Sequence, residues 1–422
     1  MTYEYLLDLA LILLSTKIFG LATKKFKMPQ VVGALLAGLI LGPAMLGVLK
    51  ETDFIKMTAE LGVIVLMFCA GLEADVKELK KSGKASLIIA IIGVIVPLIG
   101  GFAVAYFFNK PGLMGTEGNT NEMLQNIFVG VILTATSVSI TVETLKEMGK
   151  LKTRSGNAIL GAAIIDDILG IIALTVVISL ADTTVNVAIV LLKILGFFIF
   201  AAIASVLFYF FYKYWAGRTQ YGLHRYSIIA FVFCLLLAFC AEKFFGVADI
   251  TGAFIAGLVI SMTRKNEYLE EKFDVISYLY LSPVFFASIG LQVVLPDMNK
   301  TIIIFSVILT VVAVLTKVVG CGLGAKLCKY KNYQAFRIGV GMVSRGEVAL
   351  IVASKGAAVG LLGANFLGPI VVVVIITTII TPILLKIVFK IGVPPTTGEE
   401  QTTLVSGFEK LENLRERGYE KN

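Results

Sequence analysis

The sequence predicts an all-α membrane protein of about 13 transmembrane helices. Hydrophobic residues make up 57% of the 422 residues and charged residues only 16%, whereas soluble domains carry about 25% charged residues. The mean hydropathy of +0.90 agrees with this composition. Because one membrane crossing needs about 20 apolar residues, the chain has enough for about twelve spans, and a soluble fold is excluded.

Long apolar runs, bounded by charged residues, Gly or Pro, define the expected helices. The ranges 247–263 and 272–295 are also compatible with a re-entrant pair of segments. In chain order, the thirteen expected spans are 4–22, 29–48, 57–75, 85–108, 125–147, 155–181, 185–213, 225–245, 247–263, 272–295, 301–326, 334–358 and 364–391.

Basic clusters support this division, because they occupy every second connection between the expected spans. They lie at 24–27, 77–84, 146–154, 213–225, 264–265 and 329–337. By the positive-inside rule, we expect the N-terminus outside the cell membrane and the segment 392–422 as a short cytoplasmic tail. The formal net charge of +8 therefore reflects orientation in the lipid membrane, and no nucleic-acid partner is expected.

Several kinds of chemistry are excluded by what the sequence contains. The single histidine, His224, lies in a basic stretch, so proton chemistry must use carboxylates or lysines. Neither a Walker loop nor a dinucleotide-binding fingerprint occurs, and we therefore expect no nucleotide-binding domain and no cofactor. These absences argue against an ATP-driven pump, and the chain is not expected to be an enzyme.

Three ionisable residues fall near the middle of expected spans. Asp166 and Asp167 are adjacent in the sixth span, and Lys317 lies in the eleventh. Ionisable side chains at this depth are expensive and by default mark ion or proton pathways. Neighbours on a helix point about 100° apart, so one aspartate can face a water-filled cavity while the other faces a neighbouring helix.

Two expected spans are interrupted by polar residues and glycine. The fifth contains Thr136 and Ser137, and the twelfth contains the stretch from Ser344 to Glu347. Hydroxyl residues also pack between helices in a purely structural role. However, these interruptions occupy corresponding places in two six-helix halves, about 4–181 and 225–391, joined by a linker helix at 185–213. Paired interruptions predict two inverted repeats with crossed discontinuous helices.

These motifs together resemble the monovalent cation:proton antiporter superfamily, in particular the branch of NapA-type sodium/proton and Kef-type potassium/proton antiporters. The resemblance covers about residues 5–390 and implies an NhaA/NapA-like fold. The motifs that carry it are Lys27–Gly33, Ala37–Pro43, Phe68–Glu73, Thr136-Ser137, Asp166-Asp167, Pro283–Gly290 and Arg345–Glu347.

The resemblance implies antiport of protons against a monovalent cation, Na⁺, K⁺ or both. Asp167 would be the principal carrier of the cation and the proton, and Asp166 would be able to pair with Lys317. Thr136 and Ser137 would lie at the crossing of the two broken helices. Four further residues are candidates for accessory roles: Glu73, Ser344, Arg345 and Glu347.

The resemblance also implies how the transmembrane domain, residues 1–391, is divided. Helices in about 85–181 and 301–391 would form a moving core, and the remainder would form a dimerisation scaffold, so the expected assembly is a homodimer. Many Kef-like members carry a cytoplasmic nucleotide-binding domain, which is not expected in this chain.

Other functions fit the sequence less well. A sodium-coupled symporter of organic solutes uses a related fold but would need a roomier polar cavity. An intramembrane aspartyl protease needs two acids on different helices that share a water molecule, whereas Asp166 and Asp167 are neighbours on one helix. A cation channel is disfavoured because the sequence has no filter-like repeat.

Overall fold

The regular elements of the described chain are all helices. The computed structural model describes residues 3–25, 28–74, 76–110, 122–181, 187–216, 223–263, 266–293, 299–358 and 360–391. In chain order the elements are α1 (Glu4–Lys25), α2 (Gln30–Leu41), α3 (Asp53–Glu73), α4 (Val76–Phe108), α5 (Glu122–Thr134), α6 (Val138–Glu147), α7 (Arg154–Ala181), α8 (Val187–Ala216), α9 (Leu223–Cys240), the π-helical turn η1 (Ala241–Phe245), α10 (Asp249–Ser261), α11 (Asn266–Ile276), the π-helical turn η2 (Ser277–Leu281), α12 (Ser282–Leu291), α13 (Lys300–Leu327), α14 (Asn332–Gly341), α15 (Glu347–Ala358) and α16 (Ala364–Val388).

The helices are those of a multi-pass membrane protein. Within the described residues, ten helical segments are long and apolar enough to cross a membrane, and α2, α10 and the segment Val348–Ala357 are shorter apolar helices. The most apolar of the long segments turn large hydrophobic side chains outward. In α8, only 17% of the apolar window is buried, as expected of a helix whose surroundings are themselves apolar.

Some of the predicted boundaries are wrong. The fourth helix begins at Val76 and not at residue 85, because it continues through a lysine-rich segment beyond the apolar run. The second ends at Leu41 and not at residue 48, since Gly42 adopts an extended conformation and Pro43 has no N–H to continue the helix. The residues from Asn266 to Leu291 form one stretch long enough to span, so that segment is not a short re-entrant loop.

The two predicted interruptions are confirmed. Residues 135–137 separate α5 from α6, and residues 343–346 are unwound between α14 and α15. Each pair of short helices therefore enters the protein from opposite ends and meets at a non-helical segment.

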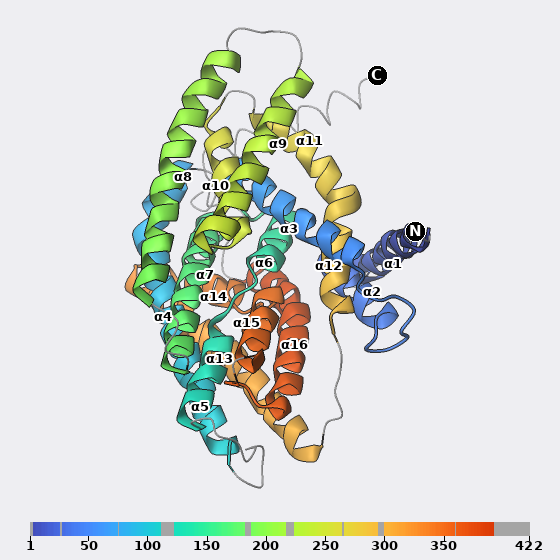
Figure 1. The fold of residues 1–422 in the computed structure, drawn as a ribbon, viewed down its shortest axis with the longest axis vertical. Coiled ribbons are helices and arrows are strands. Elements are labelled where there is room, and N and C mark those ends of the chain that lie inside the picture. The colour runs from blue at the N-terminus through green and yellow to red at the C-terminus, as the bar shows by residue number, and fades with distance from the viewer. Residues whose placement is uncertain are drawn as a thin grey trace.

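The helices pack into two bundles (Figure 1). In the α4–α13 bundle, α4 packs along α5, α7 and α13, and α13 also contacts α14 and α16. In the α3–α10 bundle, α3 packs against α10 and α12, α9 packs against α10, and α12 contacts α2, which packs along α1. Helix α6 contacts α7 and α16 on one side and α2 and α3 on the other. It therefore lies where the two bundles meet.

Close backbone contact between α4 and α5 depends on glycine. A Cβ atom on Gly130 would lie 2.4 Å from the carbonyl oxygen of Leu98, and one on Gly101 would lie 2.8 Å from the Cα atom of Gly130. These distances leave no room for a side chain. The packing of α5, which ends at the first interruption, is therefore set by two small residues.

We expect Gly130→Ala to destabilise the protein by about 1–3 kcal/mol, because α4 and α5 would have to move apart. Thermal unfolding of the detergent-solubilised protein measures this. Gly83→Ala in α4 is the matched control: its Cβ would meet no atom within 4 Å, and alanine is favoured over glycine in a helix by about 0.5–1 kcal/mol. Equal melting temperatures for both variants would contradict the packing argument.

Candidate functional site

The two unwound segments contact each other at the centre of the α4–α13 bundle. The backbone N–H of Ser137 donates to the carbonyl oxygen of Ser344 at 2.8 Å, and the hydroxyl of Ser344 donates to the carbonyl oxygen of Ser137, also at 2.8 Å. Both serines are fully buried. The interruptions predicted from separate halves of the sequence thus form one hydrogen-bonded crossing.

Thr141 stabilises the crossing through hydrogen bonds, and Gly346 leaves room for the two segments to approach. The Thr141 hydroxyl lies 2.8 Å from the Ser344 hydroxyl and donates to the carbonyl oxygen of Gly341, also at 2.8 Å. A Cβ atom on Gly346 would lie 2.7 Å from the Oγ atom of Ser137. Glycine is therefore required there so that the two segments can approach.

Arg345 is fully buried in the crossing and donates to backbone carbonyls around it. Its guanidinium contacts the carbonyl oxygens of Leu133 at 2.6 Å, Val343 at 2.9 Å and Ala313 at 3.3 Å. Its own carbonyl accepts the hydroxyl of Thr378. The C-terminal ends of α5 and α14 carry partial negative charge and orphan carbonyls, and the guanidinium compensates both.

Asp166 of α7 and Lys317 of α13 form a buried ion pair. The ammonium lies 2.9 Å from Oδ1 and 3.0 Å from Oδ2 of the carboxylate. Both residues are buried, Lys317 completely. The hydroxyl of Thr136 donates to the carbonyl oxygen of Met342 at 3.5 Å and also interacts with Asp166, which connects the ion pair to the first unwound segment.

Asp167 is the more accessible member of the acidic pair. It is half-buried, whereas Asp166 is buried, because consecutive side chains on α7 point about 100° apart. The two adjacent carboxylates therefore have different surroundings, and Asp166 is the one that contacts Lys317 in the geometry described above.

The remaining candidates lie in different places. Glu73, at the end of α3, forms an ion pair with Lys146 of α6 at 2.9 Å. Lys146 lies near the C-terminal end of α6, so this ion pair is not at the crossing. Glu347 begins α15, and its side chain is outside the described part of the chain. The contacts of Arg345 with three carbonyls cannot be predicted from its sequence neighbours, although an arginine in an apolar span is itself a signal.

Crossed interrupted helices around buried acidic and basic side chains define an ion-coupled secondary transporter. The chain belongs to the sodium/hydrogen exchanger family: the family described as "Sodium/hydrogen exchanger, transmembrane" matches residues 10–391. This is a family of transporters and not of enzymes.

Individual relatives agree with this family. The chain is 40% identical to the Na⁺/H⁺-K⁺ antiporter GerN of Bacillus cereus, with 92% of this chain and 97% of that protein covered. It is 35% identical to a Na⁺/H⁺ antiporter of Enterococcus hirae, over 91% and 97% of the two chains. The structure of the sodium proton antiporter MjNhaP1 of Methanocaldococcus jannaschii has the same fold, with a TM-score of 0.70, 17% identity, and 94% and 100% coverage.

We expect Asp166→Asn or Lys317→Met alone to destabilise the protein by about 3–5 kcal/mol, because each leaves one buried charge without its partner. The double variant removes both charges, and it should therefore lose less stability than the sum of the two single changes. Thermal unfolding in detergent measures the loss of stability in each of the two single variants and in the double variant.

Lys300→Met is the control for this cycle. Lys300 lies at the exposed start of α13, on the same helix as Lys317, and its replacement should change stability by no more than about 0.5 kcal/mol. If the double variant were as unstable as the two single variants added together, the pair would not interact energetically.

Proposed function

We propose that the protein is a secondary active antiporter that exchanges protons for monovalent cations, Na⁺, K⁺ or both, across the cell membrane. The observation that carries the proposal is the crossing at Ser137 and Ser344, with Asp167 beside the Asp166–Lys317 pair. The names of the relatives, which are Na⁺/H⁺ and Na⁺/H⁺-K⁺ antiporters, support the same activity.

In this proposal, competition for Asp167 couples the two fluxes. When the site is open to the side with fewer protons, the ionised carboxylate binds a dehydrated cation. Hydroxyl groups of Thr136 and Ser137 and carbonyls freed by the unwound segments supply further oxygen ligands. On the opposite side, a proton displaces the cation. Lys317 is bound to Asp166, and the neighbouring Asp167 is the group proposed to exchange the cation for the proton.

We propose that the spans, repeats and bundles of this protein are organised as in other members of the family. Thirteen spans would form two inverted repeats, about 4–181 and 225–391, with α8 between them. The α4–α13 bundle would be the moving core, and the remaining helices would form the scaffold of a homodimer. The basic clusters favour an N-terminus outside the cell and a cytoplasmic C-terminus.

We expect Asp167→Asn to abolish exchange, because the amide can neither carry a proton nor neutralise a cation. The assay uses proteoliposomes with a trapped pH dye, and Na⁺, Li⁺, K⁺ and Rb⁺ are added in turn to find which cations are exchanged. Glu122→Gln, at the exposed start of α5, is the control and should exchange normally. Wild-type exchange by Asp167→Asn would refute the assignment of Asp167 as the carrier.

Acidification should raise the apparent KM for the cation while leaving the maximal rate at saturating cation nearly unchanged, because protons and cations compete for one carboxylate. Initial rates over a matrix of pH and Na⁺ or K⁺ concentration measure this. If the cation and protons moved in the same direction, or if the cation were taken up together with an organic solute, the protein would instead be a symporter.

A further inference from the structure

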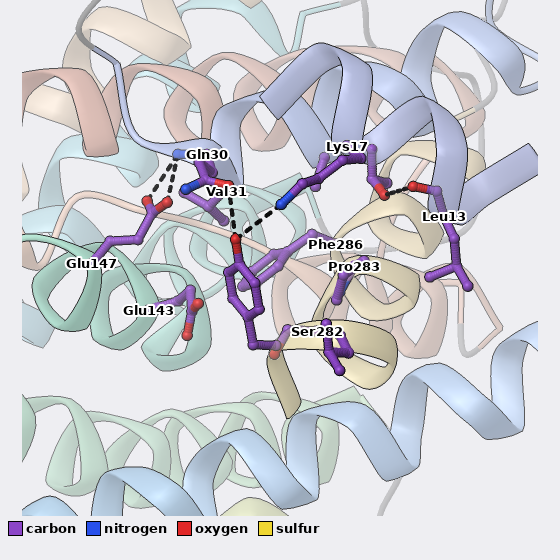
Figure 2. Close-up of a pocket in the computed structure, with 13 residues that line it drawn as sticks. Leu13, Lys17, Gln30, Val31, Glu143, Glu147, Ser282, Pro283 and Phe286 are labelled. Carbon is purple, nitrogen blue, oxygen red and sulfur yellow. Dashed lines mark hydrogen bonds between the residues drawn. The ribbon is translucent and has the colours of Figure 1, made fainter. Parts of the chain in front are cut away.

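A cavity of about 240 Å³ lies beside the crossing, between α6 of one bundle and α1, α2 and the η2–α12 stretch of the other (Figure 2). Its wall includes two carboxylates of α6, Glu143 and Glu147, together with Lys17, Gln30 and Tyr278. Neither Asp166 nor Asp167 lines it. Its polar groups must therefore be explained separately from the acidic pair.

Most of the polar groups around this α6 cavity are bound to one another. Both carboxylate oxygens of Glu147 accept the backbone N–H of Gln30, at 2.8 and 2.9 Å. The ammonium of Lys17 donates to the Tyr278 hydroxyl at 3.1 Å, and that hydroxyl donates to the side-chain oxygen of Gln30 at 3.4 Å. Figure 2 shows these contacts across the upper part of the cavity.

The amine closest in sequence to Glu143 is also engaged elsewhere. Lys146, one turn further along α6, forms ion pairs with Glu73 at 2.9 Å and with Asp274 at 2.5 Å. Glu73 belongs to α3, and Asp274 belongs to α11, which packs against α3. Lys146 therefore connects α6 to its neighbours, and its hydrogen-bonding capacity is directed away from Glu143.

Glu143 is the group whose bonding is incomplete. Its Oε2 atom is buried and has no hydrogen-bond partner within the described part of the protein. The charged groups that act on it include the amine of Lys146 and the carboxylates of Glu147, Glu73 and Asp274, and the ammonium of Lys17 lines the same cavity. A buried carboxylate oxygen without a partner is costly, and a cation bound in the cavity would supply the partner that Oε2 lacks.

We propose that Glu143 and the α6 cavity form a second binding site for a monovalent cation, which the ion occupies on its way to or from Asp167. The Gln30 amide and the Tyr278 hydroxyl place two more oxygens in the same wall. Glu143 is five residues from the first residue of α6, roughly 8 Å of helix rise from the crossing. The inference rests on the proposed antiport function.

The first test is kinetic. Glu143→Gln keeps the shape of the side chain and removes its charge, so the apparent KM for the exchanged cation should rise several-fold while the maximal rate stays within twofold. Glu143→Asp should restore much of the affinity, and Glu122→Gln is the control for loss of a carboxylate at an exposed position. An unchanged KM in Glu143→Gln would overturn the proposal. A shifted pH profile with an unchanged cation KM would also overturn it, because it would identify a proton relay.

The second test separates this site from Asp167. The cation-dependent rise in melting temperature is measured in detergent with NaCl or KCl against choline chloride. Asp167→Asn should retain part of this rise, and the double variant Asp167→Asn/Glu143→Gln should lose it. If Asp167→Asn alone abolished the whole rise, the second site would be refuted while the antiport proposal stood. Absence of cation-dependent proton exchange by the unaltered protein would refute the antiport proposal and leave this measurement readable.

A third measurement needs no change at Glu143. Dicyclohexylcarbodiimide labels carboxyl groups in apolar surroundings, and mass spectrometry locates the labelled residue. In the Asp167→Asn protein, Na⁺ or K⁺ should slow labelling of Glu143, and choline should not. Labelling of Glu143 at the same rate in all three salts would contradict the proposal even if Glu143→Gln failed to fold.

Discussion

The hydrogen bonds between the two unwound segments are the interaction on which the rest of the structure depends. Backbone groups that leave a helix at membrane depth have no water to bind, and each unsatisfied group costs several kcal/mol. Here Ser137 and Ser344 satisfy each other through backbone and hydroxyl groups. Arg345 supplies donors to the carbonyls of Leu133 and Val343 at the interruptions and to that of Ala313 in the neighbouring helix α13. The break is therefore tolerated because each half of the protein completes the other.

The same crossing explains how two adjacent aspartates acquire different roles. Asp166 points towards Lys317 and the hydroxyl of Thr136, and a charge buried so deeply is stable only with such partners. Asp167 points about 100° away on the same helix and is half-buried. A buried ion pair and a more accessible carboxylate can thus stand next to each other because helix geometry separates their surroundings.

Helix α6 connects this chemistry to the rest of the molecule. It begins at the crossing and ends against the other bundle, where Glu147 caps the start of α2 and Lys146 pairs with Glu73 and Asp274. Any movement of the α4–α13 bundle along its neighbour must rearrange these contacts. The α6 cavity lies in that same interface, so the ion binding proposed there would be coupled to the position of α6.

The sequence by itself determined the fold class, the approximate spans, the two interruptions and the buried charges, because hydropathy, glycine and misplaced ionisable residues are local signals. Only the tertiary structure decided which groups meet. Asp166 and Lys317 are 151 residues apart, and the carbonyls that Arg345 contacts come from α5, α13 and its own segment. Glu143 lies in an ordinary-looking stretch of α6, and its incomplete bonding depends on Lys146 being held by other helices. Such contacts between distant segments depend on how the helices pack, which no local pattern encodes.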